Sequence, residues 1–154
     1  PVTANFAPYL LERAQMYMNN DQARNAMLDY DAYYKAVNGQ VNDLFYYYRE
    51  QAALKARQYQ RALDDIVKAI ELSPKDLTYR AEHAVVNLRV GRYEESMKIL
   101  NEILKDEPKY GEAYRLLGLC QIQLKKTDEA CGNFNKAKEL GDPNVDELIK
   151  KYCK

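Results

Sequence analysis

Residues 58–74 read QYQRALDDIVKAIELSP, and residues 92–108 read RYEESMKILNEILKDEP. When the two stretches are aligned, Ala62 and Ser96 fall at the same place, and Ala130 continues the series at the same spacing. A constant spacing of about 34 residues indicates an internal repeat. The repeat decides the fold.

The repeat extends toward the N-terminus, because Ala26 precedes Ala62 by two residues more than this period. The first repeat is therefore two residues longer than the others, with the extra length near Asn38-Gly39-Gln40, a turn-like patch. The predicted division of the single array is 7–42, 43–76, 77–110 and 111–144, followed by a terminal helix at 145–154.

Each repeat contains two helical patterns. Ala62, Ile66, Ala69 and Ile70 recur at the spacing of one helix face, and no strand pattern competes with them. The sequence thus predicts an all-α fold of four helix–turn–helix repeats. An end repeat exposes a core face, so we expect the last ten residues to form a capping helix.

Composition argues against several classes of partner. Lys plus Arg number 23 and Asp plus Glu number 23, so the formal charge is zero, which disfavours nucleic acid and a polybasic membrane patch. No apolar run approaches the roughly 20 residues that span a bilayer. The chain begins at Pro1 and not at Met, so we expect a fragment or a processed product of a longer protein. Its compartment stays open between the cytoplasm and the periplasm or envelope of a bacterium.

Catalysis is not expected. The chain has one histidine, His83, which we interpret as partly buried near Asn87, and it has neither a Gly-rich phosphate loop nor a CxxC motif. We therefore predict a protein that is not an enzyme, with no cofactor and no metal site.

Two charge pairs recur with the repeat. Arg13 precedes Asp29 by the same separation as Arg49 precedes Asp65, and both pairs span the turn between two helices. Antiparallel helices would bring the partners level, which predicts a structural ion pair in each of the first two repeats. A chance recurrence of charges is the alternative.

A helix–turn–helix period of about 34 residues resembles the tetratricopeptide repeat, here of the kind found in bacterial proteins. The positions that match best lie in the last repeat: Tyr114, Leu117, Gly118, Ala130, Phe134 and Ala137. One departure is Glu50, where the family has a small residue. Either the helix is rotated there, with Ala52 and Ala53 making the close contact, or Glu50 is paired.

The resemblance implies a right-handed α-α superhelix that holds a peptide or partner segment of another protein in a concave groove. The residues at the groove positions are Leu11, Gln15, Leu44, Tyr47, Tyr48, Gln51, Lys55, Val85, Arg89, Arg115 and Leu119. In the aromatic stretch LFYYYR (44–49), Phe45 and Tyr46 are expected in the core, which leaves Tyr47 and Tyr48 for solvent or a ligand. The alternative is that both rings pack on neighbouring side chains or on an upstream segment. Three cations on one side suit an acidic flank.

The family's best-known groove grips a C-terminal carboxylate with Lys, Asn and Arg. The matching positions hold Leu11, Gln15, Tyr48, Thr78 and Glu82. Because the cations are missing, we do not expect this chain to bind the tails of heat-shock chaperones.

The cysteines number three, which leaves their state open. Cys131 lies before Pro143, and Cys153 lies after it by a similar separation. We expect their helices to be antiparallel neighbours, which would place the two thiols at nearly the same height. Some bacterial repeat proteins resemble this ending. A disulfide between them is one interpretation, with Cys120 free, and buried free thiols are the other.

Two other functions stay open beside the interaction scaffold. One is a structural or self-assembly module that forms homo-oligomers, and the other is the recruiting arm of a larger enzyme or sensor.

Overall fold

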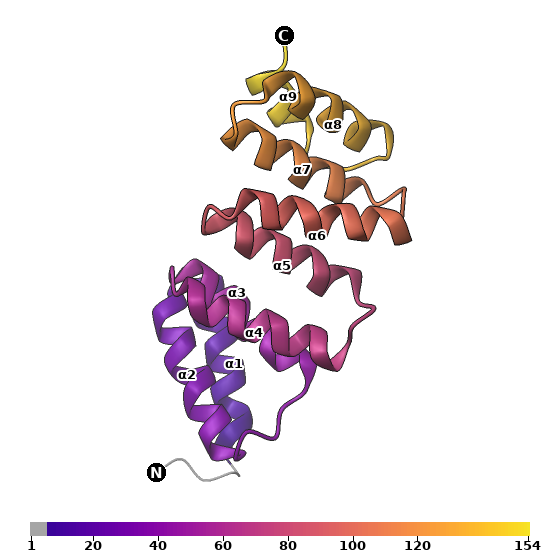
Figure 1. Ribbon diagram of the computed structural model, residues 1–154. Helices are drawn as coiled ribbons and strands as arrows, with labels where there is room; N and C mark the ends of the chain where they lie inside the picture. Colours follow the sequence, from indigo (N-terminus) through magenta and orange to yellow (C-terminus); the bar gives the residue numbers. More distant parts are fainter. Residues whose placement is uncertain (1–5) are drawn as a thin grey trace. The chain divides into compact units, whose positions relative to one another are not determined.

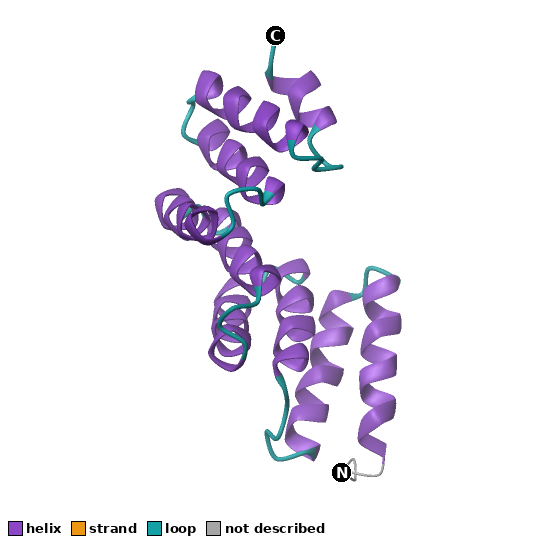
Figure 2. Ribbon diagram, turned by 90° about the vertical axis from the view of Figure 1, so that its right-hand side faces the viewer, coloured by secondary structure: helices purple, strands orange, loops and turns teal. Residues whose placement is uncertain are grey.

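The structure, a computed structural model, describes residues 6–154, and this part of the chain contains helices and no strand (Figure 2). The helices of the described residues are α1 (Ala7–Asn19), α2 (Ala23–Ala36), α3 (Asp43–Lys55), α4 (Tyr59–Leu72), α5 (Leu77–Arg89), α6 (Tyr93–Asp106), α7 (Gly111–Gln123), α8 (Thr127–Glu139) and α9 (Asp146–Tyr152). The predicted all-α fold of helix–turn–helix pairs with a terminal helix is confirmed.

The chain divides into two compact units, Pro1–Lys75 and Asp76–Lys154. In the N-terminal unit α1 packs on α2, α2 on α3 and α3 on α4 (Figure 1). Small residues at the crossings, among them Ala14, Ala26 and Ala62, are fully buried. Because they carry only a methyl group, the helices approach closely at these points.

The C-terminal unit contains α5 to α9, with two apolar clusters. One cluster lies between α5, α6 and α7, and the other joins α7, α8 and α9 around Phe134, which is fully buried. Gly118 faces this ring so closely that a Cβ atom there would lie 2.4 Å from a ring carbon. A small residue is therefore required where α7 crosses α8.

The turns inside the helix pairs share one geometry. Each has three residues, and the middle residue has a positive φ: Asp21, Arg57, Gly91 and Lys125. The connections between pairs differ. Six residues, 37–42, join α2 to α3, whereas four residues, 107–110, join α6 to α7.

At Glu50, where the sequence departs from the repeat pattern, the side chain is paired, as the second interpretation predicted. Its side chain is fully buried, and Oε2 accepts a hydrogen bond of 2.8 Å from the Gln51 side chain. Ala52 and Ala53 are fully buried as well. Helix α3 thus makes its close contacts through the two alanines while the carboxylate is enclosed.

Candidate functional site

The aromatic stretch of α3 separates into buried and accessible rings. Phe45 is buried and stacks on Tyr33, with the ring centroids 5.5 Å apart, and Tyr46 is half-buried. Tyr48 is 46% exposed, and its ring centroid lies 5.6 Å from that of Tyr47. The ring most open to another molecule is therefore Tyr48.

Beside Tyr48 the N-terminal unit contains a cavity of about 760 Å³, which we call the α1–α3 cavity. Its walls come from α1, from the second half of α2, from the connection 37–42 and from the first turns of α3, all of which can be followed in Figure 1. The lining residues are Leu11, Gln15, Tyr30, Tyr33, Gln40, Val41, Asn42, Leu44, Phe45 and Tyr48. The volume is typical of a ligand pocket, which holds about 300–1,000 Å³.

Aliphatic and aromatic side chains make up most of the cavity lining, beside three neutral amide side chains. None of the described residues that line it is charged. Burial raises the pKa of Tyr30 to about 12, so its hydroxyl stays protonated at neutral pH. Asn42 uses its side-chain oxygen to accept a 3.0 Å hydrogen bond from the backbone N–H of Phe45 and thereby caps α3. The side-chain amides of Gln15 and Gln40 supply further neutral donors and acceptors.

The structure brings together four of the predicted groove residues in this cavity: Leu11, Gln15, Leu44 and Tyr48. The other three from the same unit, Tyr47, Gln51 and Lys55, lie outside its lining. Lys55 contacts the Asp21 carboxylate at 3.0 Å, with both side chains exposed.

The remaining groove positions belong to the C-terminal unit. Val85 and Leu119 are half-buried against its apolar cluster, and Arg89 is exposed. Arg115 donates to Asp142 at 2.9 Å and to Glu112 at 3.0 Å, so carboxylates of its own unit compensate its charge. Two of the three cations expected to meet an acidic flank, Lys55 and Arg115, thus already contact an acid in the chain.

Sequence reasoning missed the residues from α2 and from the connection, of which Tyr33 and Val41 are examples. The family's groove positions lie on the first helix of each pair and do not include them. The one sequence signal was the extra length near Asn38-Gly39-Gln40, which places residues 40–42 along one side of the cavity.

Both recurring charge pairs form, and one of them adjoins this site, because the Arg49 guanidinium carbon lies 5.1 Å from the centre of the Phe45 ring in the cavity lining. Arg13 contacts Asp29 through two hydrogen bonds of 2.7 Å, and Arg49 contacts Asp65 through two of 2.8 Å. The Arg49 side chain is 13% exposed, and its guanidinium carbon lies 4.9 Å from the centre of the Tyr34 ring. Arg49 therefore joins three helices, since Tyr34 lies on α2 and Asp65 on α4.

Outside the cavity, two side chains that could take part in chemistry, His83 and Cys120, have pKa values shifted by burial. Burial lowers the pKa of His83, and its backbone carbonyl accepts a 2.9 Å hydrogen bond from Asn87. Burial also raises the pKa of the Cys120 thiol. Among residues 6–154 no three His, Cys, Asp or Glu side chains gather as metal ligands, and no helix is long and apolar enough to cross a membrane.

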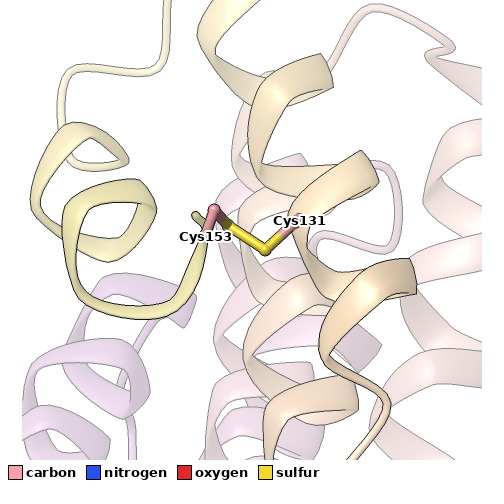
Figure 3. The surroundings of a disulfide bond; sticks show 2 residues. All are labelled: Cys131 and Cys153. Carbon is pink, nitrogen blue, oxygen red and sulfur yellow. A yellow bond between two sulfur atoms is a disulfide. The ribbon is translucent and has the colours of Figure 1, made fainter.

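Cys131 and Cys153 form a disulfide in the structure. Cys131 lies on α8 and Cys153 directly follows α9, and their Cα atoms are 5.6 Å apart (Figure 3). The bond ties the terminal helix to the last helix pair, where Leu148 and Ile149 pack against the cluster around Phe134.

Two family models match the chain. The model described as anaphase-promoting complex, cyclosome, subunit 3 matches residues 19–103, more than half of the chain. A tetratricopeptide repeat model matches residues 82–145.

Curated relatives match about two thirds of the chain. The small glutamine-rich tetratricopeptide repeat-containing protein 2 of Mycosarcoma maydis is 30% identical over 99 residues, which are 64% of this chain and 28% of that protein. The heat shock protein STI1 of Saccharomyces cerevisiae is 32% identical over 101 residues, 63% of this chain and 17% of that protein. The chain thus spans between 17% and 28% of the length of these two relatives.

Solved structures share the fold. YrrB, described as a TPR protein with an unusual peptide-binding site, superimposes with a TM-score of 0.76 at 18% identity, over 94% of this chain and 74% of that one. A fragment of MamA from Desulfovibrio magneticus RS-1 gives a TM-score of 0.71 at 19% identity, over 88% of this chain and 75% of that one. None of these comparisons limits the chain to bacteria, so the bacterial resemblance stays a prediction.

Proposed function

The chain belongs to the tetratricopeptide repeat family, and on this premise we propose that it is a scaffold that binds another protein by holding one of its peptide segments in the α1–α3 cavity. Tetratricopeptide repeat proteins bind other proteins or peptides. The observation that supports this site is a largely apolar cavity of about 760 Å³ that opens beside the exposed Tyr48 ring.

Rigid aromatic and aliphatic side chains form the rim and the wall of the cavity. Tyr48 and Leu44 are 46% and 47% exposed at the rim, whereas Tyr33 and Phe45 form the wall. Aromatic side chains supply large contact areas at a low cost in conformational entropy, which is why they are enriched at binding sites. A side chain of the partner that enters the cavity would add roughly 25 cal/mol for each Å² of apolar surface removed from water.

The test uses random peptides displayed on phage and selected against the immobilised 154-residue chain. Synthetic peptides of the enriched sequences, acetylated and amidated at their ends, are titrated by fluorescence polarisation. We expect Leu44→Glu together with Tyr48→Ser to weaken binding by about tenfold or more. Both side chains are half-exposed, so the changes alter the rim without emptying the core.

The matched control is Leu28→Glu, because Leu28 is 68% exposed on α2 and does not line the cavity. It should leave both the binding and the melting temperature unchanged. A selection that enriches no peptide over a blank support contradicts the proposed function. Enriched peptides that bind the rim variant as tightly as the parent also contradict it.

A self-assembly function has one observation in its favour. Tyr9 and Met16 are 56% and 61% exposed, and because they are two helical turns apart they lie on the same face of α1. Light scattering at several protein concentrations distinguishes the two functions. Self-assembly is supported if the molar mass of the parent rises with concentration and the Met16→Glu variant has the mass of a single chain at every concentration.

A further inference from the structure

The connection between α2 and α3 is longer than the corresponding connection in the C-terminal unit. It contains residues 37–42, whereas residues 107–110 join α6 to α7. The two additional residues account for the greater length of the first repeat, 7–42, relative to the later repeats. The helices themselves are not longer, because α2 and α6 both have 14 residues. The extra length is therefore confined to the segment that borders the α1–α3 cavity.

Three local features hold this connection in shape. Asn38 and Gly39 both have positive φ, at 53° and 72°, and reverse the chain after α2. A Cβ on Gly39 would lie 3.0 Å from the Tyr34 hydroxyl oxygen, so the backbone lies directly against that ring. Asn42 caps α3 through the backbone N–H of Phe45. The segment is thus shaped at both ends, and residues 40–42 between them line the cavity.

We propose that this longer connection converts the groove of the first helix pairs into a pocket for one uncharged aromatic side chain of the partner, and that Leu11 and Val41 make it reject a carboxylate. The inference rests on the proposed function and names the chemistry of its ligand. The walls that would contact the guest ring include Tyr30, Tyr33 and Phe45. Such rings favour edge-to-face or offset stacking with another aromatic ring.

The last helix pair provides a contrast within the same chain. Arg115 has the same place in its repeat as Leu11, since each is the fifth residue of its repeat and of its helix. Arg115 lines a smaller cavity of about 230 Å³, bordered by residues 140–144, where it contacts Asp142 and Glu112. A cation at this repeat position therefore accommodates carboxylates. With leucine there and no charge among the described lining residues, a carboxylate entering the α1–α3 cavity would lose hydration and would meet neutral donors but no cation to compensate its charge.

A pair of small probes that differ by one charge tests the inference. N-acetyl-tryptophanamide carries a neutral indole anchor, and N-acetyl-tryptophan adds a carboxylate to the same frame. Each is titrated into ¹⁵N-labelled protein and followed by two-dimensional NMR. We expect saturable shifts of the Gln40, Val41 and Tyr48 amide signals with the amide probe, and binding weaker by about tenfold or more with the acid. Equal affinity for the two probes, or shifts that do not saturate, would overturn the inference.

Two variants address the connection itself. Deleting Asn38 and Gly39 restores a four-residue connection and should abolish the saturable shifts. Val41→Asp keeps the length of the connection and places a charge in the cavity wall, so it should also abolish the saturable shifts. This second variant tests the inference even if the deletion variant does not fold. Arg115→Leu is the matched control, and it should leave binding of the amide probe unchanged.

The phage-selected peptides separate failure of this inference from failure of the proposed function. If those peptides lose affinity with the rim variant Leu44→Glu plus Tyr48→Ser, but bind Val41→Asp as tightly as the parent, the groove function stands and the role of the connection is wrong. If aromatic residues are enriched in the selected peptides, and if both variants bind these peptides less tightly than the parent does, the inference is supported.

Discussion

Gly118 shows how one residue determines a helix crossing. A methyl group there would lie 2.4 Å from a ring carbon of Phe134, which is fully buried and cannot move aside. We expect Gly118→Ala to destabilise the fold by roughly 1–3 kcal/mol through overpacking, measured by urea unfolding. Gly132, on α8, is the control, because none of the described residues beyond its own helix turn lies within 4 Å of its Cβ position. Gly132→Ala should stabilise the protein by about 0.5–1 kcal/mol, and equal effects at the two sites would refute this account of the crossing.

Arg49 is the most enclosed cation of the recurring charge pairs. Its side chain is 13% exposed, against 39% for Arg13 in the corresponding pair. Arg49→Leu would leave the Asp65 carboxylate buried without that partner, which should cost about 3 kcal/mol, whereas Arg49→Leu with Asp65→Leu should cost less. A double-mutant cycle measured by chemical denaturation should show strong coupling for this pair and weaker coupling for Arg13 with Asp29. Additive effects for both pairs would mean that the hydrogen bonds contribute nothing to stability.

His83 makes a defined contribution to the pH dependence of stability. Burial lowers its pKa from the ordinary value of 6.5, and the charge of Glu95 offsets only part of this shift. Below about pH 6.5 the unfolded chain therefore binds a proton that the folded chain does not, so stability falls as the pH falls toward the folded pKa. The free energy of unfolding should decrease less between pH 7 and pH 5 in His83→Gln than in the parent. Parallel curves for the two proteins would contradict this assignment.

At the scale of the element, α9 is a short helix that depends on its attachment. It has seven residues, none of them buried, and its ion pair between Lys150 and Glu147 is exposed. The disulfide closes a loop of 22 residues, for which the loss of unfolded-state entropy stabilises the fold by about 3 kcal/mol. We expect reduction, or Cys131→Ser with Cys153→Ser, to lower the melting temperature and to speed hydrogen exchange in α9 before any change in α5.

The state of the thiols is measured directly on protein purified from its own compartment. Alkylation after denaturation without a reductant should modify only Cys120, and tryptic peptides should contain Cys131 linked to Cys153. Three alkylated cysteines would show that the terminal helix is held by packing alone in the cell.

At the scale of the whole molecule, each compact unit has its own core. The C-terminal unit holds two apolar clusters and the disulfide within residues 76–154. The stability of a repeat array is approximately a sum of contacts between neighbouring elements, so this fragment contains most of what it needs. Expressed alone and oxidised, it should give a helical circular dichroism spectrum and a cooperative melting transition. A spectrum typical of an unfolded chain would show that neighbour contacts inside the fragment are insufficient.

The sequence alone predicted which residues face the core. Positions such as Ala62, Gly118 and Phe134 fit the pattern of the repeat, and both helix periodicity and close helix packing are local properties that recur in every repeat. The ion pair of Arg49 with Asp65 was also predictable from the sequence. The two residues are equally far from a three-residue turn, so antiparallel helices place them side by side. Periodic features of a solenoid are therefore visible before its structure is known.

The tertiary structure decided what breaks the period. The α1–α3 cavity takes residues from α1, α2, α3 and the connection 37–42, and no periodic rule predicts how a connection of six residues folds back beside the helices. It also decided that Arg115 contacts Asp142, which turns an expected free cation into an internal ion pair. Sequence determined this fold because each helix pair repeats the same short-range packing. The candidate site depended on the structure because part of its wall is a segment of the first helix pairs that departs from the repeat.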